Sequence, residues 1–209
     1  MTDLVLLAAF WVIWCGLHSL LARPTVTAKL KRLSCGFAGY YRFCYNLFAC
    51  ITLLPYVFWQ WQRVAGPALL SWTGPWRLLQ GAAWLAAGLL AWGGVRSYPL
   101  PEFLGFPPAA VPTPPPPPLM TTGVLGIVRH PWYLAGLLIL WTRDLDRADL
   151  LTAVLLSLYL FLGAHWEEQR LFRTYGQAYG DYRRQVAGWI PWLAQILRFL
   201  HRRSKRPQD

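Results

Sequence analysis

Charged residues are scarce in this sequence of 209 residues. Asp, Glu, Lys and Arg make up 14% of it, whereas 56% of it is hydrophobic. This composition excludes an ordinary soluble domain, and the 13 tryptophans favour a membrane protein, because Trp and Tyr concentrate at membrane interfaces. The net charge of +11 does not indicate nucleic-acid binding, because the basic residues lie at the ends of apolar segments and in the C-terminal tail.

Cysteine is also scarce, and two common sequence motifs are missing. The four cysteines form no C-x-x-C pair, and no His/Cys cluster has the spacing of a metal site, so we expect neither a bound metal nor a disulfide framework. No G-x-G-x-x-G motif follows a strand, which argues against a Rossmann domain. No basic n-region precedes the first apolar segment, which we therefore interpret as a retained membrane span.

Apolar segments of transmembrane length recur along the chain. A helix needs about 20 mostly apolar residues to cross roughly 30 Å of hydrocarbon. We therefore predict an all-α integral membrane protein, a single domain over residues 1–209, with about five transmembrane helices. The last two form a helical hairpin, and the fourth is either short or extended by residues before Pro131. The predicted spans are 4–22, 41–61, 76–95, 127–142 and 149–166.

The segments outside these spans predict the orientation. Residues 96–122 contain an unbroken run from Pro114 to Pro118, which cannot be helical and predicts a stiff, extended loop. A proline-rich ligand for an SH3-like domain is the alternative interpretation. With the N-terminus outside, sixteen of the 20 Lys and Arg residues fall on the inner side, nine of them in the tail 167–209. The positive-inside rule therefore predicts a cytoplasmic loop and a cytoplasmic C-terminus.

The beginning of the tail has an amphipathic pattern. Positions at three- and four-residue spacing share one helical face, which predicts a helix that continues out of the fifth span and lies on the bundle or on the membrane surface. Glycines at 176 and 180 weaken this helix, so a bend there is expected. The shared face carries Glu168, Phe172, Tyr175, Tyr179, Tyr182 and Val186.

Polar motifs flank the predicted hairpin at its open end. Arg129 and His130 precede the fourth span, and His165, Glu167 and Glu168 end the fifth. Because the open ends of a hairpin are neighbours, a cation, an imidazole and two carboxylates would meet at one membrane boundary. Carboxylates at a membrane edge are costly unless they are paired or functional, so the combination favours a site.

Each of these residues also has a structural interpretation. Arg129 can reach lipid headgroups, and His130 can cap the helix that Pro131 begins. The two glutamates can be solvated or can pair with nearby arginines of the tail. Glu168 lies on the tyrosine face, so we expect it, rather than Glu167, to touch a ligand.

His18 is a separate polar residue inside the first apolar segment. Ionisable residues within a membrane are functional candidates by default. His18 is close to the cytoplasmic end, however, where a hydrogen-bonded structural histidine is equally expected. Both interpretations stay open.

The order of these motifs resembles a known superfamily. A Gly, then Arg-His-Pro-x-Tyr at 129–133, then a hairpin, then Glu-Glu-x-x-Leu at 167–171 and Tyr-Gly-x-x-Tyr-x-x-Tyr at 175–182 resemble the isoprenylcysteine carboxyl methyltransferase and phospholipid methyltransferase superfamily. Gly-Leu-His-Ser-Leu-Leu-Ala-Arg-Pro at 16–24 and Tyr-Arg-x-x-Tyr at 41–45 are similar to its bacterial branch of methanethiol S-methyltransferases and NnrU-like proteins. The matches span most of the chain.

The resemblance implies a methyltransferase in a bacterial inner membrane that uses S-adenosylmethionine as methyl donor at the cytoplasmic face. The acceptor would be a small or lipophilic thiol, carboxylate or amine, reached from the bilayer. Arg129 would suit the carboxylate of the cofactor and Glu168 its sulfonium, while His130 or a glutamate would act as a base for a thiol or an amine. The implied catalytic residues are Arg129, His130 and Glu168, and the implied cofactor-binding residues are Gly126, Val128, His130, Tyr133, Glu167, Glu168, Tyr179 and Tyr182.

Departures from the family pattern leave alternatives open. Residues 124–126 read Val-Leu-Gly where the family often has a bulky residue or a Pro-Tyr pair, and the proline run is unusually long. Membrane sterol reductases, which use NADPH, also carry an Arg-His-Pro-x-Tyr motif and a Tyr-rich C-terminal segment, although they have many more spans. A non-enzymatic assembly factor is the third possibility.

Overall fold

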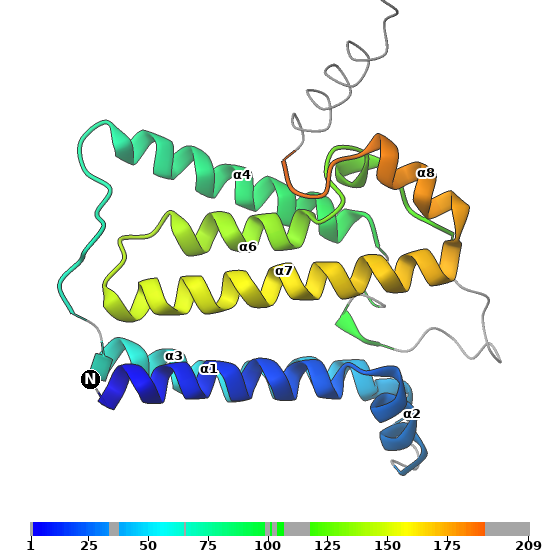
Figure 1. Ribbon diagram of the computed structural model, residues 1–209, viewed down its shortest axis with the longest axis horizontal. Helices are drawn as coiled ribbons and strands as arrows, with labels where there is room; N and C mark the ends of the chain where they lie inside the picture. The colour runs from blue at the N-terminus through cyan, green and yellow to red at the C-terminus, as the bar shows by residue number, and fades with distance from the viewer. Residues whose placement is uncertain are drawn as a thin grey trace, which may run out of the picture.

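The computed structural model describes residues 2–33, 38–64, 66–98, 101, 104–106 and 118–190, except for the side chain of Arg63. Within these residues the fold is all-helical, without a β-strand, as the sequence predicts. Figure 1 shows α1 and α3 along one side of the bundle, α7 and α6 next to them, and α4 along the opposite side. The bundle helices are α1 (Thr2–Leu21), α3 (Tyr41–Trp59), α4 (Trp76–Arg96), α6 (Pro131–Trp141) and α7 (Arg147–Tyr175).

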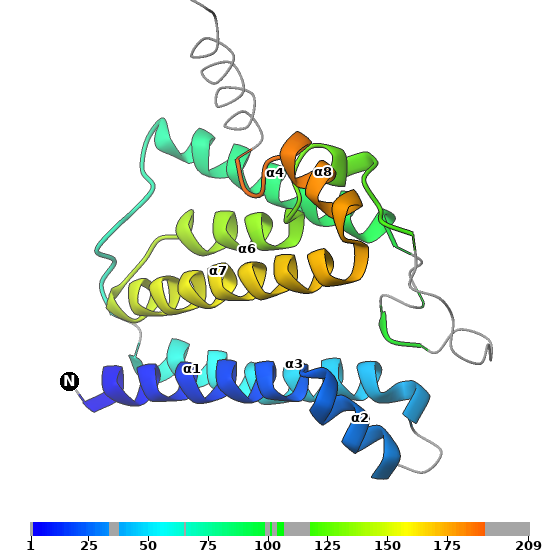
Figure 2. The ribbon, with the colours of Figure 1, turned by 45° about the vertical axis from the view of Figure 1, so that its right-hand side comes forward.

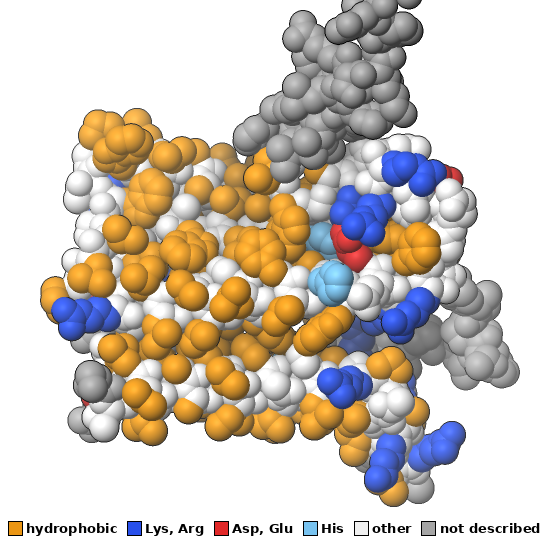
Figure 3. Space-filling view, in the orientation of Figure 1, with side chains coloured by type: hydrophobic (Ala, Val, Ile, Leu, Met, Phe, Trp, Pro, Cys, Tyr) orange, Lys and Arg blue, Asp and Glu red, His pale blue; other side chains and the backbone are white. Residues whose placement is uncertain are grey.

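Four stretches of the described chain are long and apolar enough to cross a membrane. They are Thr2–Leu21, Ala38–Gln62, Trp76–Arg96 and Arg147–Tyr175. The bundle surface carries many exposed large hydrophobic side chains, which cover most of the face seen in Figure 3. Exposed apolar surface of this extent is suited to lipid rather than to water. The chain is therefore a membrane protein.

The predicted fourth span, 127–142, is wrong at its beginning. The helix α6 has 11 residues, or about 16 Å at 1.5 Å per residue, and starts at Pro131. Proline fits the first turn of a helix because the amide hydrogen that it lacks has no partner there. The residues before it pair with a distant segment instead, since the amides of Arg129 and His130 donate to the carbonyls of Ala187 and Gly188.

Small residues bring α4 and α6 into close contact. A Cβ atom on Gly94 of α4 would lie 2.6 Å from Nε1 of Trp132, so only glycine leaves room for that indole. Gly93 meets Val124 in the same way, at 2.9 Å. The glycines near the end of α4 therefore serve close packing against Trp132 and Val124.

The N-terminal helix is fixed to the bundle by a small core with internal hydrogen bonds. Leu7, Trp11 and Tyr56 are buried together with Ala148. The Trp11 indole donates to Oγ1 of Thr152 at 2.9 Å, and the Tyr56 hydroxyl donates to the Leu7 carbonyl at 3.0 Å. Amphipathic aromatic residues thus bury their rings without leaving a polar atom unpaired.

The helix α7 is longer than a membrane requires. Its 29 residues measure about 43 Å, whereas the first twenty, which end at Trp166, already cover about 30 Å. The last turns therefore project beyond the spanning part. Gly176, at φ +53°, ends α7 and starts α8 (Gln177–Gln185), which confirms the expected bend.

The bend places α8 beside the N-terminal end of α6, as both ribbon views show (Figure 1, Figure 2). The short helix α2 (Pro24–Leu33) lies at the same end of the bundle. The proline run at 114–118, for which the sequence predicts an extended loop, lies outside the described residues except for Pro118. The projecting end of α7, α8 and the start of α6 together carry the polar motifs.

Candidate functional site

Arg129 is the centre of a polar cluster at the projecting end of the bundle. Its Nε and Nη2 donate to Oε1 of Glu168 at 3.1 and 2.5 Å. Its Nη1 donates to the carbonyl oxygens of Arg183, at 3.1 Å, and of Val186. The two charged side chains are 10% and 16% exposed, so the ion pair is largely shielded from water. One guanidinium thereby joins α6, α7, α8 and the segment that follows.

Glu168 has three cationic or potentially cationic neighbours. Besides Arg129, Nε2 of His130 lies 3.1 Å from its Oε1, and Nε of Arg183 lies 3.4 Å from its Oε2. Burial raises the pKa of Glu168, but the hydrogen bonds from His130 and Arg129 and the charges of the two arginines outweigh it and lower the pKa to about 2. The carboxylate is therefore ionised at every physiological pH.

His130 is buried in the position before Pro131 and turns its ring toward both glutamates. It occupies the N-cap position of α6, as predicted, but its side chain makes no capping hydrogen bond. Its Nδ1 lies 3.9 Å from Oε2 of Glu167, which is 34% exposed and so remains accessible. The imidazole stands between an ion-paired carboxylate and a partly open one, which is an arrangement suited to proton transfer.

Aromatic rings surround this imidazole. The rings of Tyr133 and Trp189 lie with their centroids 5.5 and 5.4 Å from that of His130. The Trp189 ring also contacts Phe161 of α7, with centroids 4.8 Å apart. The cluster therefore has a wall of electron-rich rings beside the imidazole.

The segment 186–189 closes the cluster by backbone pairing. Val128 and Ala187 form an isolated parallel bridge, and Val128 is fully buried. A Cβ atom on Gly188 would lie 3.2 Å from Nη2 of Arg129, so glycine permits this close approach. Helical periodicity reaches only Val186 of this segment, and the sequence identified neither residues 187–188 nor Trp189 as part of the site. The one usable signal was a Gly that follows the tyrosine helix.

Two tyrosines of α8 lie beneath the guanidinium. The Tyr182 hydroxyl donates to the Leu125 carbonyl at 2.7 Å, and burial raises its pKa. The Tyr179 hydroxyl is buried beside Arg129 but has no hydrogen-bond partner of normal geometry among the described residues. Burial and the charge of Glu168 raise the pKa of Tyr179 to about 12, so it stays protonated and keeps a hydrogen to donate.

Several residues that the sequence predicted near the site lie outside the polar cluster. His165 is exposed and its Nε2 meets the Gln169 amide at 2.8 Å, and no hydrogen bond or ion pair among the described residues joins it to the cluster. Gly126 is exposed, and a Cβ atom on it would meet only the Thr121 carbonyl, at 3.2 Å. Phe172 is 51% exposed, because α7 ends soon after it and α8 leaves in a new direction. These residues contribute no direct contact to the cluster.

Tyr98 is a neighbour that the sequence did not identify. It follows α4, and its pKa is raised first by burial and then by the negative charge of Glu167. The end of α4 thus reaches the accessible carboxylate from a third direction. In Figure 3 the acidic, histidine and some basic side chains gather at this end of the face, beside an otherwise apolar surface.

Almost the whole chain is similar to known methanethiol S-methyltransferases. No protein-family model matches it, and no solved structure is significantly similar. Methanethiol S-methyltransferase 2 of Bradyrhizobium diazoefficiens is 31% identical over 204 residues, which cover 91% of this chain and 74% of that protein. The methanethiol S-methyltransferase of Pseudomonas deceptionensis is 27% identical over 92% of this chain and 73% of its own length. That of a Pseudomonas species is 38% identical over 66 residues, 31% of this chain and 25% of its own.

Proposed function

This chain belongs to the methanethiol S-methyltransferase family, and we propose that it transfers a methyl group from S-adenosylmethionine to a small thiol. Of the three functions that the motifs left open, the relatives support the membrane methyltransferase. The identities of the methyl donor and of the acceptor are the proposal. The observation that carries the proposal is the cluster of Arg129, His130 and two glutamates beside an aromatic wall at the end of the bundle.

The residues of the cluster fit S-adenosylmethionine. This molecule supplies a methyl group bound to a positively charged sulfur, which an accessible carboxylate and aromatic faces attract. Glu167 is the accessible carboxylate next to His130, and Tyr133 and Trp189 supply aromatic rings beside that histidine. The buried hydroxyl of Tyr179, which has no protein partner of normal geometry, is a donor available to a polar ligand.

We assign the roles of these residues differently from the sequence prediction. Both oxygens of Glu168 and most donors of Arg129 are already engaged, so we assign these two residues to positioning His130 and the segment 186–189. Direct contact with the ligand then falls to Glu167, together with His130 and Tyr133. Val128, Tyr179 and Tyr182 hold the floor of the site, and Gly126 supports the turn before it.

His130 is the proposed base. With Nε2 held by Glu168, its Nδ1 can accept the proton of an acceptor thiol. The thiolate sulfur then forms a bond to the methyl carbon while the bond from that carbon to the donor sulfur breaks, leaving its electron pair on the donor. Methanethiol would give dimethyl sulfide. The cluster contributes mainly alignment and proton removal.

We further propose that this end of the bundle faces the cytoplasm of a bacterial cell, with the N-terminus on the outer side. Basic residues of α2 and α8, which lie at this end of the bundle, support it. A water-soluble donor would then reach the site from the cytoplasm, and an apolar acceptor would arrive through the bilayer.

The test is titration calorimetry of detergent-purified protein with S-adenosylmethionine, and with NADPH as the competing ligand. Binding should weaken at least tenfold in Glu167→Gln and in Arg129→Ala, through a lost contact and a displaced segment. Asp181→Asn, which changes the exposed pair of Asp181 with Arg184, is the matched control and should bind normally.

Headspace chromatography of dimethyl sulfide from methanethiol then measures transfer. Absence of S-adenosylmethionine binding by folded protein would refute the proposed donor. Binding without any methylated thiol would refute the proposed acceptor class.

A further inference from the structure

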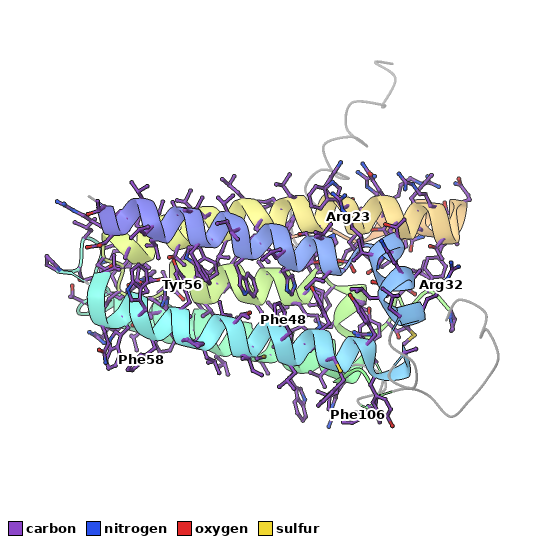
Figure 4. The ribbon with its side chains drawn as sticks, turned by 90° about the horizontal axis from the view of Figure 1, so that it is seen from below. Arg23, Arg32, Phe48, Tyr56, Phe58 and Phe106 are labelled. Atoms are coloured by element: carbon purple, nitrogen blue, oxygen red, sulfur yellow. The ribbon has the colours of Figure 1, made fainter. Side chains whose placement is uncertain are left out.

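A second polar feature lies away from the cluster, between α1 and α3. These helices run side by side, and Figure 4 shows them from below with Phe48 on α3. A cavity of about 160 Å³ lies between them, which is the size at which apolar protein cavities bind benzene, about 150 Å³. Its lining includes Phe10, Trp14 and His18 of α1 and Tyr45, Phe48 and Ala49 of α3.

His18 is the one ionisable side chain among the lining residues that is not a phenol. Its ring stacks on Trp14, with centroids 4.9 Å apart, and lies 4.8 Å from the ring of Tyr45. The Tyr45 hydroxyl donates to the backbone carbonyl of His18, at 3.2 Å, and so fixes α3 against this turn. Among the described residues no hydrogen bond reaches either nitrogen of the His18 ring.

An imidazole without a hydrogen-bond partner is unfavourable inside a membrane span. Burying a polar group unpaired costs free energy that a partner of the right chemistry returns. The stacked rings hold the imidazole in place without satisfying its nitrogens. A bound molecule that enters the cavity and donates a hydrogen bond would therefore gain apolar contact and pair this half-buried ring.

We propose that this cavity binds a small neutral thiol, with the S–H group donating to a ring nitrogen of His18 and the alkyl group against the aromatic lining. Sulfur makes favourable contacts with aromatic rings, and four rings line this cavity. The proposal rests on the proposed function, because it assigns the cavity to the methyl acceptor. It extends that function by giving the acceptor a holding site within the bilayer.

The location suits a molecule that arrives through lipid. Leu17 and Phe48, which line the cavity, are about half exposed, at 48% and 47%, so its mouth faces the hydrocarbon. On its inner side the His18 ring meets Tyr159 of α7 edge-on, with centroids 6.3 Å apart. Tyr159 precedes Glu167 by eight residues, about 12 Å along the helix. The cavity is thus close to the cluster but separate from it.

The test uses ¹⁹F NMR of 3,3,3-trifluoropropane-1-thiol with detergent-purified protein under reducing conditions. The methyl thioether of this probe is the comparison ligand, because it has the same alkyl group but no S–H. Wild-type protein should bind both saturably, the thiol about fivefold more tightly, which corresponds to one hydrogen bond.

Substitutions separate the cavity from the hydrogen bond. Ala49→Phe fills the cavity and should abolish saturable binding of both ligands, whereas Ala9→Phe, on the exposed face of α1, should leave it unchanged. His18→Phe should erase the preference for the thiol, and His18→Gln, which keeps an acceptor, should restore part of it.

Each outcome decides the proposal. Unchanged binding in Ala49→Phe, an equal affinity of wild type for thiol and thioether, or no saturable binding would overturn it. Transfer is measured separately as dimethyl sulfide from methanethiol. Saturable, His18-dependent binding in a protein that makes no methylated product would uphold the cavity and refute the methyltransferase proposal. Formation of dimethyl sulfide with a KM for methanethiol that is unchanged in Ala49→Phe and His18→Phe would uphold the methyltransferase proposal and refute the role of the cavity.

Discussion

Replacing Glu168 by Gln tests the central ion pair of the cluster. The substitution keeps the size of the side chain and one carbonyl oxygen, but removes the negative charge that Arg129 faces at 2.5 Å. Arg129 is 10% exposed and cannot move into water without breaking its bonds to the carbonyls of Arg183 and Val186. We therefore expect a loss of stability rather than a relaxation of the side chains.

The size of this loss of stability depends on the hydrogen bonds that Arg129 keeps. Leaving a buried charge without its partner costs about 3–5 kcal/mol, and a hydrogen bond to a charged group contributes about 1.5–3 kcal/mol. Because Arg129 retains two carbonyl partners and Glu168 is 16% exposed, we expect about 2–3 kcal/mol. For a chain of this size, this corresponds to a fall in Tm of roughly 5–10 °C.

The assay is differential scanning fluorimetry in detergent, with Asp181→Asn as the matched control. That carboxylate pairs with Arg184 on the exposed surface of α8, where an ion pair contributes at most about 1 kcal/mol. The control should melt within about 3 °C of wild type. If the Tm of Glu168→Gln equals that of the control, Arg129 and Glu168 do not form a stabilising buried ion pair and the reasoning fails.

The same pair predicts a pH dependence with a definite sign. The pKa of Glu168 is lowered from 4.5 to about 2, so its stabilisation is complete above pH 4.5 and is lost as the pH falls toward 2. The Tm difference between wild type and Glu168→Gln should therefore be constant from pH 8 to 5 and narrow below pH 4.5. A difference that changes between pH 8 and 6 would instead point to a histidine.

Three further substitutions test residues 186–189 and the two tyrosines of α8 that lie beneath the cluster. Gly188→Ala places a Cβ atom 3.2 Å from Nη2 of Arg129. It should lower the free energy of unfolding by about 1–3 kcal/mol in fluorimetry and weaken S-adenosylmethionine binding in calorimetry. An unaffected protein would mean that residues 186–189 can shift without loss of stability. Tyr182→Phe removes the hydrogen bond to the Leu125 carbonyl and should lower the free energy of unfolding by about 1–3 kcal/mol. Tyr179→Phe removes a hydroxyl that has no hydrogen-bond partner of normal geometry among the described residues, and should change that free energy by less than about 0.5 kcal/mol. Equal losses of stability in the two variants would contradict this assignment.

The helical fold was predictable because the bilayer imposes its own length on apolar segments. The third predicted span, 76–95, matches α4 within one residue, and the hairpin of α6 and α7 turns where charged residues interrupt the apolar pattern. The fourth span was predicted less well. An 11-residue apolar helix is below the length that hydropathy identifies, and its start was set by pairing with residues 187 and 188.

The meeting of Arg129 and His130 with the glutamates was predictable from the hairpin alone, since its two open ends lie together. The choice of partners was not. Sequence allowed Glu168 to pair with nearby tail arginines, but the bend at Gly176 brings Arg183 back to it instead. The same bend decides that Glu167, rather than Glu168, stays accessible.

By itself the sequence determined that the chain is a helical membrane protein and which polar residues gather at one end of a hairpin. Both follow from local rules, namely the hydrocarbon thickness and the helical repeat. Only the tertiary structure decided that α8 and residues 186–189 fold back over Arg129, that Trp189 and Tyr98 flank the site, and that His18 faces a cavity. Those contacts join residues far apart in the chain through backbone carbonyls and ring packing, and neither leaves a periodic pattern in the sequence.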